Sequence, residues 1–364
     1  MITRERILII RLSALGDVVH TLAFVNRLRT ARPHAHITWI LQPLAFELVR
    51  HQQNIDRFIV FSRSGGLKAL GELFRQLGRE RFDLVFMLQV SIKASLVSLC
   101  VRGDRKLGYD FRRSREGQWL FANNRIARRP AAHVLDQFFE FLDHLHISPA
   151  PLDWAIRITE EERAWQARFF RTISRPVAAF VVASSKPAKD WPAERYAEVM
   201  DAVDKRLNLQ PMIVGGPSRR EHALSKEIAS RCRCRPVIAL ERPVRHTLLQ
   251  LAGARVVVAP DTGPMHMAVA LNVPTVALYG YSDPRRCGPY QRFADLVIDK
   301  YTMNRDTRQP ITRKTRPGRM AMITPAEVLA KIELALARYQ PLAPAPAAGF
   351  AEQTAQGAVC HRKH

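Results

Sequence analysis

The sequence predicts an α/β protein built from two doubly wound parallel sheets, one after the other along the chain. Short β-branched apolar runs alternate with amphipathic helical stretches over most of the 364 residues, which is typical of parallel sheets with helices on both faces. The alternation begins afresh after the segment 171–175. Because this length allows two domains, each with its own core, we expect Rossmann-like domains at 1–173 and 174–340 that face each other across a cleft, and a tail at 341–364.

The first half begins with a short buried strand, Ile7–Ile10, which runs through Arg11-Leu12-Ser13-Ala14-Leu15-Gly16-Asp17 into a helix. That helix carries apolar residues at helical spacing from Val18 to Leu28. A basic stretch at 102–129 is less regular. The remaining elements expected here are strands at 37–41, 58–61 and 84–88, and helices at 67–78, at 132–145 and after the capping residue Thr159.

The second half repeats the pattern. Its expected strands are 177–183, 212–214, 237–240, 256–259, 275–278 and 296–298, with helices at 193–206, 219–231, 244–254 and 266–271. The basic segment 300–319 reads as a loop, and Thr324-Pro325 opens a last helix that reaches about residue 339. The Pro/Ala-rich tail from residue 341 is expected to be disordered.

The charge of the chain predicts an anionic partner. Lys+Arg 56 against Asp+Glu 33 gives a net charge of +23, which fits nucleic acid, an anionic membrane surface, a phosphorylated substrate, or a solvated basic surface without a specific ligand. Five cysteines are odd in number and widely spread, so no disulfide framework is indicated, and we read Cys232-x-Cys234 as ordinary. No apolar run is long enough for a signal peptide core or a membrane span. The sequence therefore predicts a cytoplasmic protein.

A phosphate-binding turn is predicted where the apolar run Val256–Val258 ends. Asp261-Thr262-Gly263-Pro264 follows and leads directly into a helix, and the unpaired N–H groups of a helix start bind anions. Gly263 lets the backbone approach an anion closely, while Thr262 and His266 offer donors. Asp261 would repel phosphate, so we expect it to cap the helix or to accept hydrogen bonds from sugar or ribose hydroxyls.

A second group of polar residues follows the first strand of the second half. Ser184, Ser185 and Lys189 can bind phosphate oxygens, or they are solvated surface residues. A lysine can stabilise a diphosphate leaving group in place of a metal, and the spacing of the acidic residues and histidines predicts no Mg²⁺ or Mn²⁺ site. Glu221 could hold a pair of ribose hydroxyls, although a surface helix charge fits its spacing as well.

Asp17 is the candidate general base. It follows a strand at the edge where doubly wound sheets bind ligands, and it could remove a proton from an attacking hydroxyl. The competing interpretation is a helix N-cap. Basic residues of the first half lie nearest the expected cleft and suit an acceptor with phosphate or carboxylate groups, unless they form a solvated face; they are Lys93, Arg112, Arg113, Arg115 and His133.

Three motifs together resemble the lipopolysaccharide heptosyltransferases of glycosyltransferase family 9. They are the stretch from Arg11 to Thr21, Lys189-Asp190-Trp191-Pro192, and Asp261-Thr262-Gly263-Pro264-Met265-His266 with the following Tyr279-Gly280 and Asp283-Pro284. The similarity spans roughly residues 5 to 338. The segment 89–93, with Gly108-Tyr109-Asp110 and Ser114-Arg115-Glu116, is most similar to the first-heptose enzyme.

The resemblance implies a GT-B fold, an inverting mechanism without metal or other cofactor, ADP-heptose as donor and Kdo-lipid A or a partial core as acceptor. Asp17 then resembles the base and Lys189 the diphosphate lysine, while Thr262, Gly263 and His266 fall in the donor loop. Ser184, Ser185, Glu221 and Asp261 lie on the donor side, and Lys93, Arg115 and His133 on the acceptor side. An acceptor displayed on the anionic inner leaflet would explain the charge and a peripheral position at the cytoplasmic face of the inner membrane.

Other functions stay open at this stage. A family 9 enzyme could add a later heptose or use another nucleotide sugar. A basic nucleic-acid-binding protein would fit the charge, but the sequence has no recognised nucleic-acid module and few aromatic residues among its basic runs, so we expect no nucleic acid partner.

Overall fold

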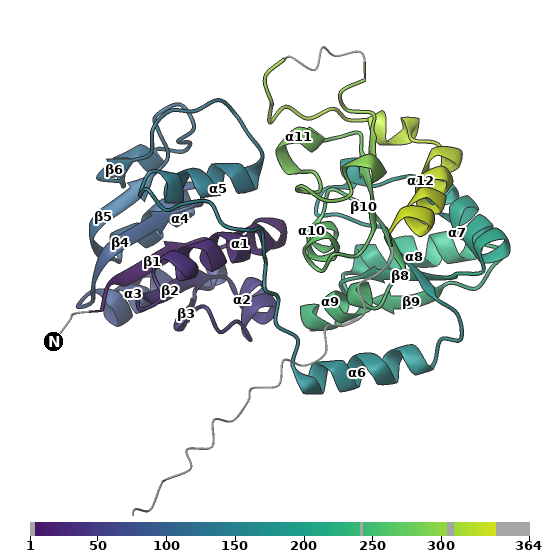
Figure 1. Cartoon of the computed structure of the whole chain (residues 1–364), viewed down its shortest axis with the longest axis horizontal. Coiled ribbons are helices and arrows are strands. Elements are labelled where there is room, and N and C mark those ends of the chain that lie inside the picture. The colour runs from purple at the N-terminus through teal and green to yellow at the C-terminus, as the bar shows by residue number, and fades with distance from the viewer. Residues whose placement is uncertain (1–3, 241–242, 304–308, 340–364) are drawn as a thin grey trace, which may run out of the picture.

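The structure, a computed structural model, describes residues 4–240, 243–303 and 309–339 and contains the two parallel sheets that the sequence predicts (Figure 1). The first sheet has the strand order β3-β2-β1-β4-β5-β6 and the second the order β12-β11-β10-β7-β8-β9. Every strand pair within the described residues is parallel. The predicted fold class is confirmed, and the predicted disordered tail 341–364 lies outside the described residues.

The first sheet is covered by helices on both faces. Its central strand carries the apolar run that the sequence shows, and Ile7–Ile10 are all buried. The elements are β1 (Arg6–Ile10), α1 (Leu15–Ala31), β2 (His36–Leu41), α2 (Pro43–Val49), β3 (Arg57–Val60), α3 (Gly66–Leu77), β4 (Arg81–Met87), α4 (Ile92–Leu99), β5 (Arg102–Gly108), β6 (Asn124–Arg125) and α5 (Val134–Asp143).

The second sheet follows α6 (Glu160–Arg171), which begins at the predicted Thr159 cap with a complete capping box. Its elements are β7 (Val177–Val181), α7 (Ala193–Leu207), β8 (Gln210–Gly215), α8 (Arg219–Arg231), β9 (Val237–Leu240), α9 (Val244–Ala252), β10 (Val256–Pro260), α10 (Gly263–Ala270), β11 (Thr275–Tyr279), α11 (Pro284–Cys287), β12 (Val297–Asp299) and α12 (Pro325–Arg338).

The sequence interpretation differs from the structure mainly between residues 102 and 125. The stretch that looked irregular contains strands β5 and β6, which lie at one edge of the first sheet. Only Leu107 and Gly108 of β5 are buried. Because the other residues of β5 are exposed or only partly buried, this strand lacks the apolar run that identifies a fully buried strand, although it pairs with β4 on one side and β6 on the other.

Each sheet has one point at which its strand order reverses, and ligands of doubly wound folds bind there. In the first sheet the reversal lies between β1 and β4, and in the second between β7 and β10. The segment with Asp17 follows β1, the segment with Lys189 follows β7, and the Asp261-Thr262 turn follows β10. The fold therefore places the main predicted site residues at the two reversal points.

The two halves meet through α1 and α10. The starts of these helices are so close that a Cβ atom on Gly16 would lie 2.4 Å from Cδ2 of His266, and one on Gly263 would lie 2.8 Å from Cβ of Leu15. A second contact joins α9 to α2, where Nη1 of the buried Arg245 donates to the carbonyl oxygen of Leu48 over 2.9 Å. Among the helices of the described part, none combines the length and apolar character needed to cross a bilayer.

Candidate functional site

Asp17 lies in the first turn of α1, and it does not cap the helix. The N-cap residue is Ala14, whose side chain cannot accept a hydrogen bond, so the alternative interpretation of Asp17 as a cap is wrong. Its carboxylate pairs instead with the guanidinium of Arg11. About a third of the Asp17 side chain is exposed, so the carboxylate can be reached from the site.

Arg11 is fixed from two other directions. Its Nη1 donates to the carbonyl oxygen of Leu88 over 2.8 Å, and its guanidinium lies 5.2 Å from the ring centre of Phe138. The guanidinium is almost fully buried, and such a rigid donor limits the orientations of the carboxylate that it holds. The side chain of Asp17 is therefore positioned by β1 and by the end of β4.

Across the interface, Lys189 and Asp261 form an ion pair. Nζ of Lys189 lies 2.6 Å from Oδ2 of Asp261 and also donates to the Asp261 carbonyl oxygen at 3.1 Å. Both side chains are largely buried. Since an ammonium has three N–H donors, one donor of Lys189 is left for a ligand.

Asp261 accepts bonds from several groups at once, although it was expected to cap α10 or to bind sugar hydroxyls. Ser282 donates to its Oδ2 over 2.6 Å, and Nε2 of His266 lies 3.8 Å from its Oδ1. Burial by itself would raise the pKa of Asp261, but His266 and Lys189 together hold it far below its ordinary value. Asp261 is therefore an ionised internal anchor for the residues around it.

Thr262 is the N-cap of α10, the role that was considered for Asp261. Its side-chain oxygen accepts from the backbone N–H of Met265 at 3.4 Å, and Pro264 stands in the first turn. A proline in the first turn has no N–H to leave unpaired. The remaining first-turn N–H groups, with Gly263 where the two domains touch, keep the character of an anion site.

The other residues predicted for the donor side lie after β7 and, in the case of Glu221, in the first turn of α8. Ser184 and Ser185 follow that strand, and the loop is closed because Oδ1 of Asp190 accepts from the backbone N–H of Ser184 over 2.9 Å. Ser185 is exposed. The carboxylate of Glu221 is occupied in the structure, because it accepts from the Gly216 N–H at 2.7 Å and from the Ser218 hydroxyl at 2.6 Å.

Three histidine rings meet edge to face across the domain interface, and the sequence analysis did not single out one of them, His20. His20 of α1 lies 4.7 Å from the ring of His266 and 5.2 Å from the ring of His133, between centroids. Neither ring nitrogen of His20 has a hydrogen-bond partner within the described residues. Burial, and then the charges of His266 and His133, lower its pKa well below the ordinary value. Its place three residues after Asp17 was the available signal.

His133 was expected on the acceptor side, and the structure places it where the two domains meet. Its Nδ1 accepts from the Leu135 N–H at 3.1 Å, which caps α5. Its Nε2 lies 3.1 Å from the carbonyl oxygen of Gly288 in the other domain. This pattern assigns the proton of a neutral ring to Nε2. Burial lowers the pKa of His133 to about 4.

Two arginines that the sequence did not single out belong to the same region. Arg286 of α11 interacts electrostatically with Asp17 and Asp261, and Arg313 interacts with Asp17, Arg286 and Arg115. Loss of solvent, and then the charges of Arg286 and Arg115, lower the pKa of Arg313. Within the described ranges neither Arg286 nor Arg313 forms an ion pair. Lys93 and Arg115 are exposed at the start of α4 and in the loop after β5.

One group of possible metal ligands lies elsewhere in the second domain. Among the described residues Asp201, Cys232 and Cys234 bring their ligand atoms within 4.8 Å of one another. The Asp201 carboxylate already accepts from the backbone N–H of Arg233 at 2.8 Å and of Cys234 at 2.9 Å. Burial raises the pKa of the Cys232 thiol to about 11. The Asp201 carboxylate is thus already engaged by the backbone of the segment that carries both cysteines.

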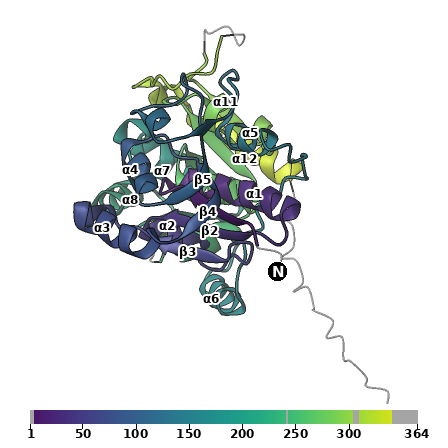
Figure 2. The same ribbon diagram turned by 90° about the vertical axis from the view of Figure 1, so that its left-hand side faces the viewer.

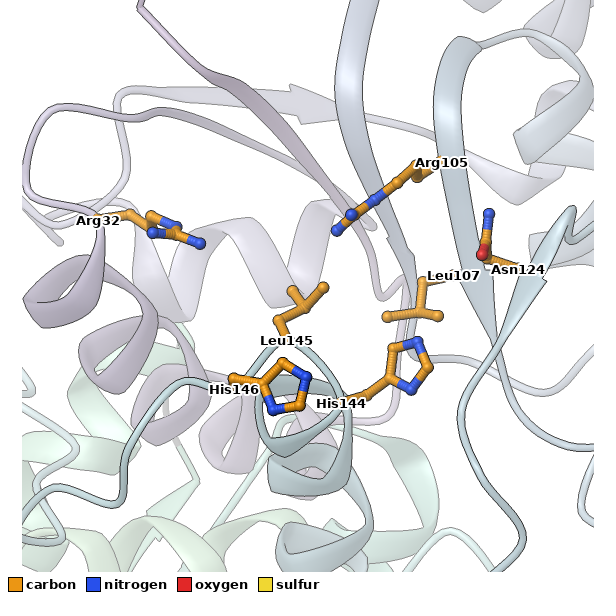
Figure 3. Close-up of a pocket in the computed structure, with 7 residues that line it drawn as sticks. All are labelled: Arg32, Arg105, Leu107, Asn124, His144, Leu145 and His146. Atoms are coloured by element: carbon orange, nitrogen blue, oxygen red, sulfur yellow. The ribbon is translucent and has the colours of Figure 1, made fainter.

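A separate cavity of about 290 Å³ lies in the first domain, between β5, β6 and the end of α5 (Figure 3). None of the predicted site residues lines it. Figure 3 shows its lining side chains, which are Arg32, Arg105, Leu107, Asn124, His144, Leu145 and His146. The site at the domain interface is therefore distinct from this cavity.

Comparison with known proteins identifies the family. The family model described as "Glycosyltransferase family 9 (heptosyltransferase)" matches residues 70–314. The chain belongs to glycosyltransferase family 9. This confirms the resemblance seen in the three motifs, and the enzyme is a heptosyltransferase of the lipopolysaccharide core.

Individual relatives agree with that assignment. The chain is 33% identical over 297 residues to the lipopolysaccharide core heptosyltransferase OpsX of Haemophilus influenzae, covering 81% of this chain and 84% of the relative. It is 27% identical to lipopolysaccharide heptosyltransferase 1 of Escherichia coli, covering 78% and 91%. The structure of the E. coli heptosyltransferase WaaC with ADP superposes with a TM-score of 0.71 at 23% identity, covering 91% and 99%. The predicted GT-B fold is confirmed.

Proposed function

We propose that this enzyme transfers heptose from ADP-heptose to the Kdo-lipid A inner core, with inversion at the anomeric carbon. The observation that carries the proposal is the meeting of two half-sites: the carboxylate of Asp17 at the start of α1, and the anion-binding start of α10 beside Lys189. One half suits a general base and the other a diphosphate leaving group. The E. coli heptosyltransferase WaaC was solved with ADP, which supports an ADP-linked donor for this chain as well.

The proposed chemistry is a single displacement. Asp17 removes the proton from an acceptor hydroxyl, whose oxygen attacks the anomeric carbon of heptose. The bond from that carbon to the diphosphate oxygen breaks, and its electron pair leaves with ADP. Arg11 holds the Asp17 carboxylate in place, so that the base lies ready on the acceptor side.

Lys189 would stabilise the departing diphosphate without a metal. Two of its three N–H donors bond to Asp261, which aims the third at a ligand. Asp261 does not have to touch the phosphate to act, because its buried carboxylate orients the lysine and His266. Turnover that survives a chelator such as EDTA would support this mechanism, and loss of turnover restored by Mg²⁺ would contradict it.

On the acceptor side, we infer that Arg286 and Arg313 bind an anionic group of the acceptor together with Arg115. Loss of solvent lowers the pKa of the Arg313 guanidinium most, and repulsion by Arg286 and Arg115 lowers it further. Such an arrangement is stabilised when an anion binds between them. Kdo supplies a carboxylate, and core sugars can also carry phosphate.

The direct test is to incubate the purified chain with ADP-heptose and either Kdo-lipid A or its monoheptosylated form, and to follow ADP release. Release with Kdo-lipid A alone supports transfer of the first heptose, and release with the monoheptosylated form alone supports a later position. Release with neither acceptor would contradict the proposal.

A further inference from the structure

The first domain exposes an unusual number of large apolar side chains. Of the thirteen that are exposed in the described part of the chain, eight lie between residues 67 and 120. Leu67 and Leu120 are the most exposed of them, at 86% and 67%. The eight are Leu67, Phe74, Ile92, Leu96, Leu99, Phe111, Trp119 and Leu120, and they are called the apolar face below.

These residues come from three segments that touch one another. Helices α3 and α4 pack side by side, and Sγ of Cys100 after α4 donates to the carbonyl oxygen of Leu70 in α3 (Figure 2). The loop after β5 joins them, because Glu116 accepts from the backbone N–H of Ile92 at 2.7 Å. Within that loop the rings of Phe111 and Trp119 lie 5.4 Å apart. The three segments that carry the apolar face therefore lie next to one another.

Helix α3 shows why the face cannot belong to the core. It is amphipathic, but the side chains that it buries are Leu73 and Leu77, while Leu67 and Phe74 point into solvent. Exposed cations alternate with the apolar residues along the three segments; they are Lys68, Lys93, Arg112 and Arg115. Leucine, phenylalanine and tryptophan beside lysine and arginine are the composition of surfaces that lie in a membrane interface.

We propose that the apolar face docks the enzyme on an anionic lipid bilayer. Apolar side chains would enter the interface, and the cations between them would face anionic headgroups, which attract basic residues near the surface. Lys93 and Arg115, which the sequence places on the acceptor side, lie in the same segments. An acceptor sugar could then reach Asp17 while its acyl chains stay in the bilayer. This inference rests on the lipid-anchored acceptor of the proposed function.

The test is flotation of the full chain with vesicles of phosphatidylcholine alone or with phosphatidylglycerol added. The double variant Leu67→Ser with Leu120→Ser should lower partition onto the anionic vesicles about tenfold or more, since each leucine loses much of its transfer free energy. A matched control, Ile238→Ser with Leu334→Ser, changes two exposed apolar residues of the second domain and should partition like the wild type. Equal partition of both double variants would overturn the proposal.

A second arm separates docking from catalysis. Turnover is compared on Kdo-lipid A in vesicles and on the same Kdo disaccharide freed of its acyl chains. The variant in the apolar face should be slower only on the vesicle-bound acceptor. If the wild type transfers heptose to neither acceptor, the proposed function is contradicted. The flotation experiment still shows whether the apolar face binds anionic vesicles. A change in molecular mass of the variant without vesicle binding by the wild type would show instead that the face joins two copies of the chain.

Discussion

Oδ2 of Asp261 lies 2.6 Å from Nζ of Lys189, and the two residues come from turns that follow different strands of the second sheet. This pair links the β10–α10 turn to the loop after β7 at the reversal point of the sheet. It explains an acidic residue at the edge of an anion site, because the negative charge faces the lysine and His266. The buried Asp261 carboxylate therefore holds the Lys189 and His266 side chains in place.

The first prediction concerns that carboxylate. Asp261→Asn leaves the Lys189 ammonium largely buried without its partner, so the free energy of unfolding at pH 7 should fall by about 3 kcal/mol. The pKa of Asp261 is far below its ordinary value, so its contribution is complete above the pKa of an unfolded aspartate and is lost as the pH falls below that value. Urea unfolding at pH 7 and pH 3 should therefore show a smaller difference between wild type and variant at pH 3. An equal difference at both pH values would contradict the assignment.

The second prediction distinguishes a role of Asp17 as general base from a role in binding ADP. Asp17→Ala should lower kcat about 100-fold to 10,000-fold, because a positioned general base contributes that much. The affinity for ADP should stay within about twofold, since Asp17 lies on the other half of the site from Lys189. Isothermal titration with ADP and steady-state turnover measure the two quantities. Unchanged turnover would remove Asp17 from the proposed role.

The third prediction tests the closeness of α1 and α10. A Cβ atom on Gly16 would lie 2.4 Å from Cδ2 of the buried His266, so Gly16→Ala should destabilise the protein by about 1–3 kcal/mol. It should also lower turnover by moving the two half-sites apart. Gly71→Ala in α3 is the matched control, because nothing lies within 4 Å of its added Cβ. Thermal unfolding measures the melting temperatures of both variants. Equal melting temperatures would contradict the prediction, because they would show that the contact between α1 and α10 can rearrange to fit the added methyl group.

The sequence predicted most of the fold because central strands are apolar on both faces. Val256–Val258 and Ile7–Ile10 are all buried, and such runs are recognisable without any knowledge of their partners. Strand β5, which lies between β4 and the edge strand β6, was missed because only Leu107 and Gly108 of its residues are buried. The positions of the turns with Asp17 and Lys189 followed from where strands end.

The roles of single residues at the interface could not be predicted in the same way. Thr262 rather than Asp261 caps α10, and spacing alone does not distinguish two adjacent capping candidates. His20, Arg286 and Arg313 become site residues only through contacts between segments far apart in the chain. For Arg286 and Arg313 such contacts leave no local pattern in the sequence, whereas His20 had one, its position one helical turn after Asp17.

The fourth prediction is a dependence of stability on pH. Burial lowers the pKa of His133 from 6.5 to about 4, so the unfolded chain takes up this proton more readily than the folded one. Stability is therefore complete above pH 6.5 and falls by up to about 3 kcal/mol as the pH decreases towards 4. His133→Gln should reduce this acid-side loss, measured by urea unfolding between pH 7 and pH 4. His34→Gln, which changes an exposed histidine, should leave the loss unchanged. An identical pH profile for all three proteins would contradict the prediction.

The last prediction concerns the basic segment after residue 300, of which residues 304–308 lie outside the described ranges. Its loop is held to α11 and to Tyr301, because Thr312 donates its N–H to Asp283 at 3.3 Å and the Tyr301 hydroxyl donates to the carbonyl oxygen of Lys314 at 2.9 Å. This brings Arg313 close enough to Asp17 and Arg115 to interact with both electrostatically. The loop lies above α11 in Figure 1. Arg313→Ala should therefore raise the KM for the acceptor by about tenfold to 100-fold and leave the KM for ADP-heptose unchanged, since a charged hydrogen bond is lost on one substrate only.

Lys314→Ala is the matched control, because it removes the next cation of the same loop, whereas Arg313 is the one that interacts with Asp17, Arg286 and Arg115. Its KM values should equal those of the wild type. Two further acceptors show which anionic group Arg313 binds. One has its Kdo carboxylate esterified, and the other carries an added phosphate. If Arg313 binds the carboxylate, esterification abolishes the difference between wild type and Arg313→Ala. If it binds phosphate, the difference grows with the phosphorylated acceptor. An acceptor KM that Arg313→Ala leaves unchanged in every case would show that the arginines of this cluster serve the nucleotide or the surface alone.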